Sequence, residues 1–198
     1  MEALQILVKN MEKKTDIRTR ILNARTQMSY EDWWEKSHCI CNKVTTHPFF
    51  LNAKNIFCYI DVRNEVGTRA LIEHAWALGK RVAAPRICGG EMDFYYFQSF
   101  QELTEDAFHI PSPSIESEIA NTSEALIIMP GAVFDKHMHR IGYGKGYYDK
   151  YIEKHPDCKT LAVAFQFQVL DNIPFDTHDK CPQYLITEEY IYGKEFAQ

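Results

Sequence analysis

Four of the nine glycines in the chain fall within sixteen residues, close to two basic side chains. The densest part of this stretch runs from Arg140 to Asp149 and reads Arg-Ile-Gly-Tyr-Gly-Lys-Gly-Tyr-Tyr-Asp. Glycine accepts positive φ angles and lets backbone N–H groups approach a ligand closely. A helix starting after Gly146 would add partial positive charge, and Arg140 and Lys145 add full charges. The segment therefore predicts an anion-binding loop.

The spacing of this loop departs from two well-known phosphate-binding motifs. A Walker A loop needs a glycine five residues before its Gly-Lys pair and a serine or threonine after it. Here His139 and Gly146 occupy those positions. A dinucleotide-binding motif needs glycine at position 147, where the chain has Tyr147. A tight structural turn therefore remains an alternative to phosphate binding.

Two carboxylates could hold Mg²⁺, which binds one or two carboxylates together with substrate phosphates. Asp149 lies three residues after the last glycine of the cluster, and Asp179 lies in a later loop. The simpler alternatives are an acid that favours a helix dipole for Asp149 and a turn residue for Asp179. The nearby histidines lack a recognised metal-ligand spacing, so we expect exposed loop positions for His137, His139 and His178.

The elements that would position these residues alternate along the chain. Strands are expected over 55–60, 81–85, 92–97, 125–130 and 161–165, with Pro85 ending the second. Helices are expected over 12–27, 30–41, 67–78 and 146–154, with Ser29 as an N-cap and Gly79 as a C-cap. This alternation predicts an α/β fold with a mainly parallel sheet flanked by helices. Ligands bind at the carboxyl ends of such strands, so we expect the motifs in loops that follow strands.

Length and composition narrow the classes of protein. A chain of 198 residues fits one domain. Its 22 basic and 27 acidic residues give a net charge of −5, which disfavours general nucleic-acid binding. The sequence has neither an apolar run of about 18 residues nor a secretory signal, which disfavours a membrane partner. Six scattered cysteines predict free thiols in a reducing cytoplasm.

The run from Pro130 to Asp149 resembles the signature of the 5-formyltetrahydrofolate cyclo-ligase family, also called methenyltetrahydrofolate synthetases. Weaker matches follow in the family's order, over about residues 13–190: Lys14-xxx-Arg18, Tyr59-Ile60, Asn64-Glu65-Val66, Gly79 to Pro85, Phe165 to Gln168, His178-Asp179 and Ile186 to Glu188. One departure is His109, where the family often has glycine before Ile110.

The resemblance implies a fold of the isomerase/CoA-transferase-like (NagB/RpiA-like) type. A single domain would cover residues 13–198, and residues 1–12 would be an extension or the first part of helix 1. The implied activity converts 5-formyltetrahydrofolate and ATP, with Mg²⁺, into 5,10-methenyltetrahydrofolate, ADP and phosphate through an N5-iminophosphate. The implied partners are these small molecules, and we expect a monomer.

The resemblance also implies roles for individual residues. Lys145 and Arg140 would be catalytic. ATP would be bound by Lys14, Arg18, Arg140, Gly142, Tyr143, Gly144, Lys145, Gly146, Tyr147 and Tyr148. The folate would be bound by Ile60, Glu65, Tyr143, Gly144, Lys145, Gly146 and Tyr147, with Glu65 accepting paired N–H donors of the pterin. Mg²⁺ would be held by Asp149 and Asp179.

Several of these residues have simpler explanations when taken alone. Lys14 and Arg18 fit a solvated helix face, and Glu65 fits an acid in the first turn of a helix. Tyr147 and Tyr148 fit packing aromatics.

Two other functions remain open as alternatives to the cyclo-ligase. A sugar-phosphate isomerase or CoA-transferase-like enzyme would use a related fold without ATP, and the cationic residues argue against it. A non-catalytic folate- or nucleotide-binding protein is disfavoured because Arg140, Lys145 and Asp149 are all present.

Overall fold

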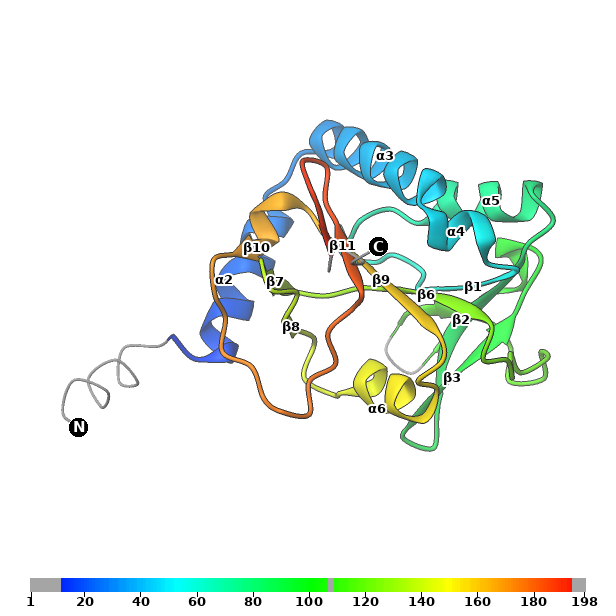
Figure 1. The fold of residues 1–198 in the computed structure, drawn as a ribbon. Helices are drawn as coiled ribbons and strands as arrows, with labels where there is room; N and C mark the ends of the chain where they lie inside the picture. Colours follow the sequence, from blue (N-terminus) through cyan, green and yellow to red (C-terminus); the bar gives the residue numbers. More distant parts are fainter. Residues whose placement is uncertain (1–11, 107–108, 194–198) are drawn as a thin grey trace, which may run out of the picture.

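The computed structural model describes residues 12–106 and 109–193. A seven-stranded sheet forms the centre of the molecule, in the order β12-β11-β9-β6-β1-β2-β3 (Figure 1). Its strands are β1 (Asn55–Cys58), β2 (Arg81–Cys88), β3 (Glu91–Tyr96), β6 (Ala125–Met129), β9 (Lys159–Val163), β11 (Tyr184–Ile186) and β12 (Ile191–Gly193). The five inner strands are parallel and both edge strands are antiparallel. This confirms the expected α/β fold with a mainly parallel sheet.

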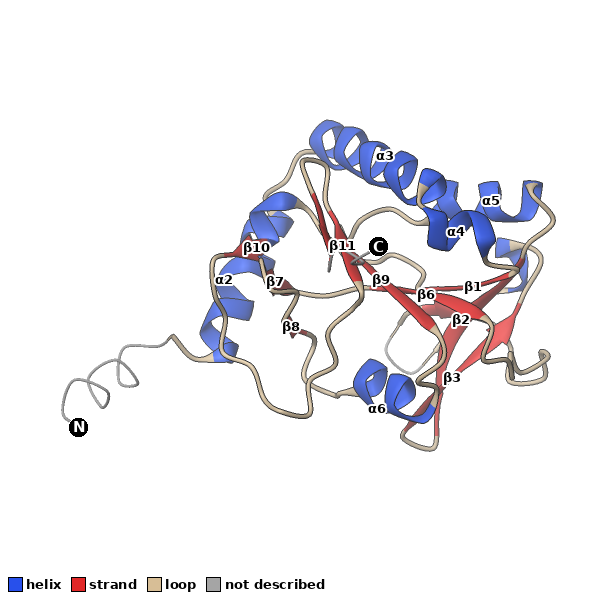
Figure 2. Cartoon of the chain, in the orientation of Figure 1, coloured by secondary structure: helices blue, strands red, loops and turns tan. Residues whose placement is uncertain are grey.

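Helices cover both faces of the sheet (Figures 1 and 2). One face carries α3 (Tyr30–Thr46), α4 (Pro48–Asn52) and α5 (Arg69–Ala77), and the other carries α6 (Tyr147–Lys154). Successive side chains of a strand point to opposite faces. Accordingly, Ile56 and Cys58 of β1 belong to the core cluster beneath α3 to α5, while Phe57 belongs to the cluster that includes Tyr151 of α6. All four are buried, as expected for a parallel sheet covered on both faces.

Helix α2 (Lys14–Thr26) packs on a second, smaller sheet instead. This sheet has the order β10-β7-β8 and contains β7 (Val133–Asp135), β8 (Arg140–Ile141) and β10 (Val169–Leu170). Ile17 and Ile21, four residues apart on one helix face, form a buried cluster with Val133 and Ile141. The packing brings the N-terminal helix beside the glycine-rich segment that follows β8.

Short elements complete the described fold. They are the 3₁₀ helices η1 (Phe100–Glu102) and η2 (Gln166–Gln168), and the paired strands β4 (Thr104–Glu105) and β5 (Pro111–Ser112). Both expected helix caps are confirmed: Ser29 Oγ accepts the Asp32 N–H at 3.1 Å, and Gly79 has a φ of +71° just after α5. No helix in the described ranges is long and apolar enough to cross a bilayer.

The expectation that Pro85 ends its strand is wrong, because β2 continues to Cys88. Strand β1 pairs only with Arg81 to Ala83 of β2, whereas β3 pairs with β2 as far as Cys88. Pro85 therefore lies where β2 has a neighbour on one side only. A proline without an N–H donor is tolerated at such an edge.

The expectation for residues 1–12 falls almost wholly outside the described residues. Glu12 is the exception, and its carboxylate forms an ion pair with Arg20 at 3.0 Å. The division into an extension and a domain over 13–198 stays a prediction.

Candidate active site

A cavity of about 680 Å³ opens at the carboxyl ends of β1 and β6. Tyr59 directly follows β1, Pro130 directly follows β6, and both line the cavity. All fourteen residues to which the sequence assigned a site role also line it: Lys14, Arg18, Ile60, Glu65, Arg140, Gly142, Tyr143, Gly144, Lys145, Gly146, Tyr147, Tyr148, Asp149 and Asp179. The structure thus brings them together from four separate segments, at the strand ends where the motifs were expected.

The glycine-rich loop connects β8 to the start of α6. Gly144 and Gly146 adopt positive φ angles of +95° and +65°, a conformation that strains residues with a side chain. A Cβ on Gly144 would also lie 3.2 Å from Nη1 of Arg18. Position 144 therefore needs glycine both for its backbone and for the close approach of α2.

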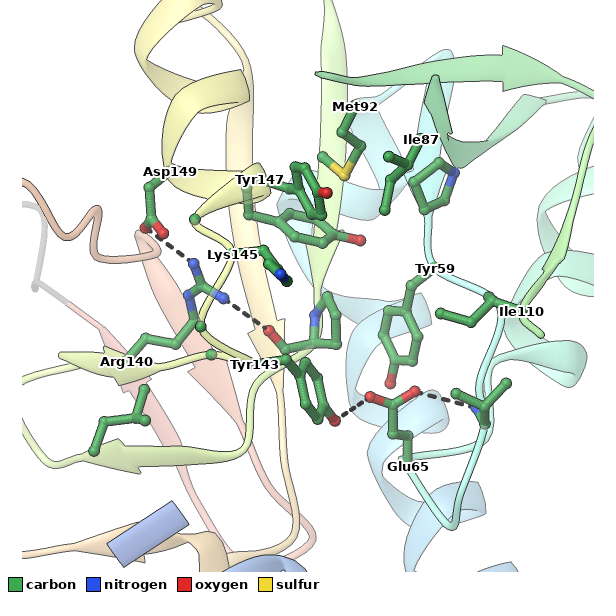
Figure 3. A pocket seen from close by; sticks show the side chains of 18 of the residues that line it. Tyr59, Glu65, Ile87, Met92, Ile110, Arg140, Tyr143, Lys145, Tyr147 and Asp149 are labelled. Carbon is green, nitrogen blue, oxygen red and sulfur yellow. Dashed lines mark hydrogen bonds and ion pairs between the residues drawn. The ribbon is translucent and has the colours of Figure 1, made fainter. Parts of the chain in front are cut away.

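Arg140 is buried and ties the beginning of this loop to its end. Its Nη1 donates to the carbonyl oxygen of Pro130 at 3.4 Å, and its Nη2 donates to Oδ1 of Asp149 at 2.9 Å (Figure 3). The Asp149 Oδ1 atom also accepts the N–H of Lys180 at 3.1 Å. Asp149 lies in the first turn of α6, as expected. The guanidinium therefore positions both the loop and the Asp149 carboxylate.

Lys145 lies at the rim of the cavity with an exposed side chain, and its ammonium points into the space between Tyr143 and Tyr147 (Figure 3). It forms no hydrogen bond or ion pair with any residue in the described part of the chain. The ammonium is thus available to an anionic ligand, in contrast to the buried Arg140.

Lys14 and Arg18 lie on the face of α2 that lines the cavity, so they are not a solvated helix face. Arg18 Nη1 donates to the Gly142 carbonyl at 3.3 Å. Lys14 Nζ lies 2.6 Å from Asp176 and 2.7 Å from Asp179. Burial alone would lower the pKa of Lys14, but its hydrogen bonds to the two carboxylates outweigh burial and raise that pKa. Burial would raise the pKa of Asp179, but the bond to Lys14, the Asp176 N–H and the charges of Lys14 and Arg140 together outweigh it and lower that pKa.

Glu65 is buried in the loop between β1 and α5, four residues before that helix begins, so it is not a first-turn helix acid. The loop is held by Trp33, whose Nε1 donates to the Glu65 carbonyl at 2.6 Å, and by Tyr59, whose hydroxyl donates to the Val66 carbonyl at 2.8 Å. The carboxylate Oε2 accepts the Val62 N–H at 3.1 Å. Burial raises the pKa of Glu65, although its hydrogen-bond donors oppose the shift.

The other oxygen of Glu65 binds Tyr143 of the glycine-rich loop. The Tyr143 hydroxyl donates to Oε1 of Glu65 (Figure 3). The same hydroxyl accepts from Nη1 of Arg25 at 3.0 Å. Burial of the hydroxyl, together with the nearby Glu65 charge, raises the pKa of Tyr143. The phenol therefore stays protonated and joins the loop to the β1–α5 segment.

Beyond Glu65 the cavity wall becomes apolar. It is formed by Ile60, Pro85, Ile87, Met92 and Ile110. Figure 3 labels the last three of these. A flat ring system fits such a wall, with Glu65 available to its polar edge.

Tyr147 and Tyr148 both pack on the core and line the cavity. Packing and a position at the ligand site, the two roles considered for them, are therefore combined in the same side chains. The Tyr148 hydroxyl is buried and has no hydrogen-bond partner in the described part of the chain. The Arg140 guanidinium carbon lies 5.8 Å from the Tyr148 ring centroid, and burial raises the pKa of this phenol.

His109 stands directly before Ile110, where the family often has glycine. His109 has a φ of +57°, the left-handed conformation that glycine adopts most easily. The next residue, Ile110, lines the cavity.

The described residues contain no group of three or more His, Cys, Asp or Glu side chains that could hold a metal. Asp149 and Asp179 nevertheless line one cavity, and each hydrogen-bonds through one carboxylate oxygen only. The second oxygen of each has no partner within the described ranges. This donor set fits Mg²⁺ bound by two carboxylates and a substrate phosphate.

The expectation of exposed loop histidines holds for His137 and His178 and is wrong for His139. The His139 ring stacks on Phe175, with centroids 3.7 Å apart, and its Nδ1 lies 2.8 Å from Oδ2 of buried Asp135. Asp135 and His139 are four residues apart and lie on opposite sides of a turn, and this spacing brings the two side chains together.

Arg25 and Asp176 line the cavity, and neither was anticipated from the sequence. Arg25 lies seven residues after Arg18, two helical turns along the same face of α2, and this periodicity was a usable signal. Asp176 lies three residues before Asp179, and this proximity in the sequence was a weaker signal.

A model of the 5-formyltetrahydrofolate cyclo-ligase family matches residues 10–188, most of the chain. The chain belongs to this family. A Schizosaccharomyces pombe protein named "Probable 5-formyltetrahydrofolate cyclo-ligase" is 32% identical to it, over 90% of this chain and 97% of the relative. The mouse 5-formyltetrahydrofolate cyclo-ligase is 31% identical, over 84% and 89% of the two chains.

The fold of the cyclo-ligase family member described here is also found in a solved relative. The solution structure of the Aquifex aeolicus 5,10-methenyltetrahydrofolate synthetase superposes with a TM-score of 0.83 and 28% sequence identity. The match covers 93% of this chain and 94% of that one. The resemblance inferred from the glycine-rich segment is thereby confirmed over nearly the whole chain.

Proposed function

We propose that this protein catalyses the ATP- and Mg²⁺-dependent cyclisation of 5-formyltetrahydrofolate to 5,10-methenyltetrahydrofolate, with release of ADP and phosphate. The observation that carries the proposal is the composition of this cavity. One part combines a glycine-rich loop with cationic side chains, and the adjoining part combines apolar walls with a buried carboxylate. A nucleotide and a folate would meet there, in a family whose curated relatives carry this activity in their names.

In this proposal the ATP phosphates lie on the loop from Gly142 to Gly146. Backbone N–H groups, the start of α6, Lys14 and Arg18 would bind them. Lys145 would stabilise charge on the transferred phosphoryl group, because its ammonium has no competing partner among the described residues. Arg140 would act by holding the loop and Asp149 in place, since its guanidinium is already bound to the Pro130 carbonyl and to the Asp149 carboxylate at the far end of the loop.

The folate would occupy the apolar part of the cavity, with its pterin ring against Ile60 and its N–H donors on Glu65. Tyr143 and Tyr147 would border the formyl group between the two substrates. Because both substrates are held in one cavity, the main contribution of the protein is orientation together with stabilisation of phosphoryl charge.

The proposed chemistry has two steps. The formyl oxygen attacks the γ-phosphorus of ATP, an O–P bond forms, and ADP leaves with the electrons of the broken P–O bond. The resulting N5-iminophosphate has an electrophilic carbon, which N10 attacks to close the five-membered ring. Phosphate then leaves with the electrons of the C–O bond, and N10 loses its proton. Water exclusion by the aromatic and apolar walls would protect this intermediate from hydrolysis.

Asp149 and Asp179 would hold Mg²⁺ through their unpaired oxygens. The ion would neutralise charge on the nucleotide phosphates. The residues' own contribution is to keep those carboxylates oriented, through Arg140 and the Lys180 N–H for Asp149 and through the Asp176 N–H for Asp179.

Absorbance in the methenyl band tests the proposal directly. Purified protein mixed with 5-formyltetrahydrofolate, MgCl₂ and ATP should give an increase that requires ATP and is abolished by EDTA. A flat trace from folded protein that binds both ligands would overturn the catalytic proposal and favour the non-catalytic binding protein.

A further inference from the structure

The hydroxyl of Tyr143 occupies the position between Arg25 and Glu65. It accepts a hydrogen bond from Nη1 of Arg25 at 3.0 Å and donates one to Oε1 of Glu65. All three residues line the cavity, and Arg25 and Glu65 are buried, with 3% and 7% of their surface exposed. A cationic donor and an anionic acceptor therefore converge on one oxygen atom inside the proposed folate site (Figure 3 shows the Tyr143–Glu65 contact).

Arg25 retains hydrogen-bonding capacity in this arrangement. Its Nε is buried and has no partner in the described part of the chain. Arginine carries five N–H donors, and leaving a buried one unpaired is costly. Because this Nε is enclosed by the protein, an acceptor that enters the cavity would meet the guanidinium at Nη1, where the Tyr143 hydroxyl binds in the free protein.

The Tyr143 hydroxyl offers one acceptor to Arg25 and one donor to Glu65, and the lactam edge of a pterin offers the same pair of groups. In a 4-oxopterin, the ring N3–H is a donor and the neighbouring C4 carbonyl is an acceptor. A carboxylate that binds N3–H and the 2-amino group leaves that carbonyl beside it, where a cationic donor would complete the pairing. Glu65 alone accounts only for the donors of this edge.

We propose that Arg25 is a further substrate-binding residue that recognises the C4 carbonyl of the pterin, and that the Tyr143 hydroxyl holds its place until the folate binds. The inference rests on the proposed function and names a specificity determinant of the same site. Arg25 and Glu65 together select a lactam edge, so a 4-amino-4-deoxy ring, which presents an amino donor to the guanidinium, binds poorly. Folate entry displaces the Tyr143 hydroxyl from both residues.

Calorimetric titration of the full chain, with ADP and MgCl₂ present to prevent turnover, tests this assignment. The two probes are 5-formyltetrahydrofolate and its 4-amino-4-deoxy analogue. The wild-type chain should prefer the 4-oxo ligand. Arg25→Met should weaken binding of the 4-oxo ligand about 10- to 100-fold, the usual range for a hydrogen bond to a charged group, and should remove the preference. Tyr143→Phe should bind the 4-oxo ligand several-fold more tightly, because this variant has no hydroxyl that the ligand must displace from Arg25 and Glu65.

Arg25→Lys keeps the charge and one donor, and it should restore part of both affinity and preference if Arg25→Met is poorly folded. ADP affinity should stay unchanged in the two Arg25 variants, since Arg25 lies at the folate part of the cavity. Wild-type affinity or wild-type preference in folded Arg25→Met would overturn the assignment while leaving the proposed function intact. Failure of the wild-type chain to bind 5-formyltetrahydrofolate would instead overturn the proposed function together with the assignment.

Discussion

Lys14 and Asp179 are joined by an ion pair of 2.7 Å between the ammonium of helix α2 and the carboxylate of the loop before β11. One of these residues is proposed to bind ATP phosphates and the other to bind Mg²⁺. The free site therefore neutralises its own charges. MgATP would exchange this pair for two others, Lys14 with phosphate and Asp179 with the metal, so neither charge is left unpaired in either state.

We expect Lys14→Met to raise the KM for MgATP about 10-fold or more, because a charged contact to phosphate is lost. The melting temperature should change little, since a partly exposed ion pair contributes only about 0–1 kcal/mol. Lys36→Met is a matched control. Lys36 lies on α3 and forms a similar ion pair with Glu188, at 2.9 Å, and neither residue lines the cavity. Steady-state kinetics of both variants decide the matter, and an equal KM in both would contradict the role of Lys14.

Lys145→Ala should reduce kcat about 100-fold or more, the range seen when one charge-stabilising donor is removed from an active site. The variant should keep the wild-type melting temperature, because the exposed side chain forms no hydrogen bond or ion pair with the described residues. Lys150→Ala is the control: Lys150 is also exposed, on α6, but does not line the cavity. Near-normal turnover by Lys145→Ala would refute the phosphoryl role.

Gly144→Ala should combine a loss of stability with a loss of ATP binding. Alanine at a φ of +95° costs about 1 kcal/mol, and its Cβ would approach Nη1 of Arg18 to 3.2 Å. Gly89→Ala in the β2–β3 turn shares the positive φ, at +59°, but its Cβ would meet no atom within 4 Å. Both variants should melt earlier, and only Gly144→Ala should raise the KM for ATP. The same KM increase in both would show that stability alone is responsible.

The raised pKa of Glu65 predicts how folate binding depends on pH. Burial lifts the pKa of Glu65 in the folded protein above the ordinary 4.5. The protonated carboxyl therefore stabilises the folded state fully at a pH below the pKa of the unfolded chain, and this stabilisation is lost as the pH rises through the pKa of the folded protein. Folate binding needs the ionised form, so affinity should fall as the pH drops through the raised pKa. Glu65→Gln should bind folate weakly, with ADP affinity retained, and should show no such pH dependence. Titrations between pH 7.5 and 5.0 measure both effects, and a matching slope in the variant would contradict the assignment.

The stacking of Phe175 on His139 anchors the loop that carries Asp176 and Asp179. His139 is held in turn by buried Asp135, so the loop is attached to the turn between β7 and β8. Phe175→Ala should raise the Mg²⁺ concentration needed for half-maximal activity several-fold, while kcat at saturating Mg²⁺ stays close to wild type. Phe175→Tyr keeps the stacked ring and should restore the wild-type requirement. An unchanged Mg²⁺ requirement in Phe175→Ala would show that the anchor does not position Asp179.

The sequence by itself determined the class of fold and the place of the site along the chain. Apolar strands alternating with amphipathic helices indicate a mainly parallel sheet, because each pattern specifies how its element must be buried. The run from Arg140 to Asp149 is local, so its glycines and charges indicated a loop before a helix without knowledge of the rest. The same local logic located the cap at Ser29 and the turn at Gly79.

Contacts between distant segments were decided only by the tertiary structure. The bond of Tyr143 to Glu65 joins residues 78 positions apart, and the pair of Lys14 with Asp179 joins residues 165 apart. Such pairings depend on the packing of α2 against the small sheet and on the order of the strands, which local propensity and periodicity do not encode. For the same reason Arg25, an ordinary helical arginine in the sequence, becomes a buried donor in the cavity only when α2 docks beside the loop.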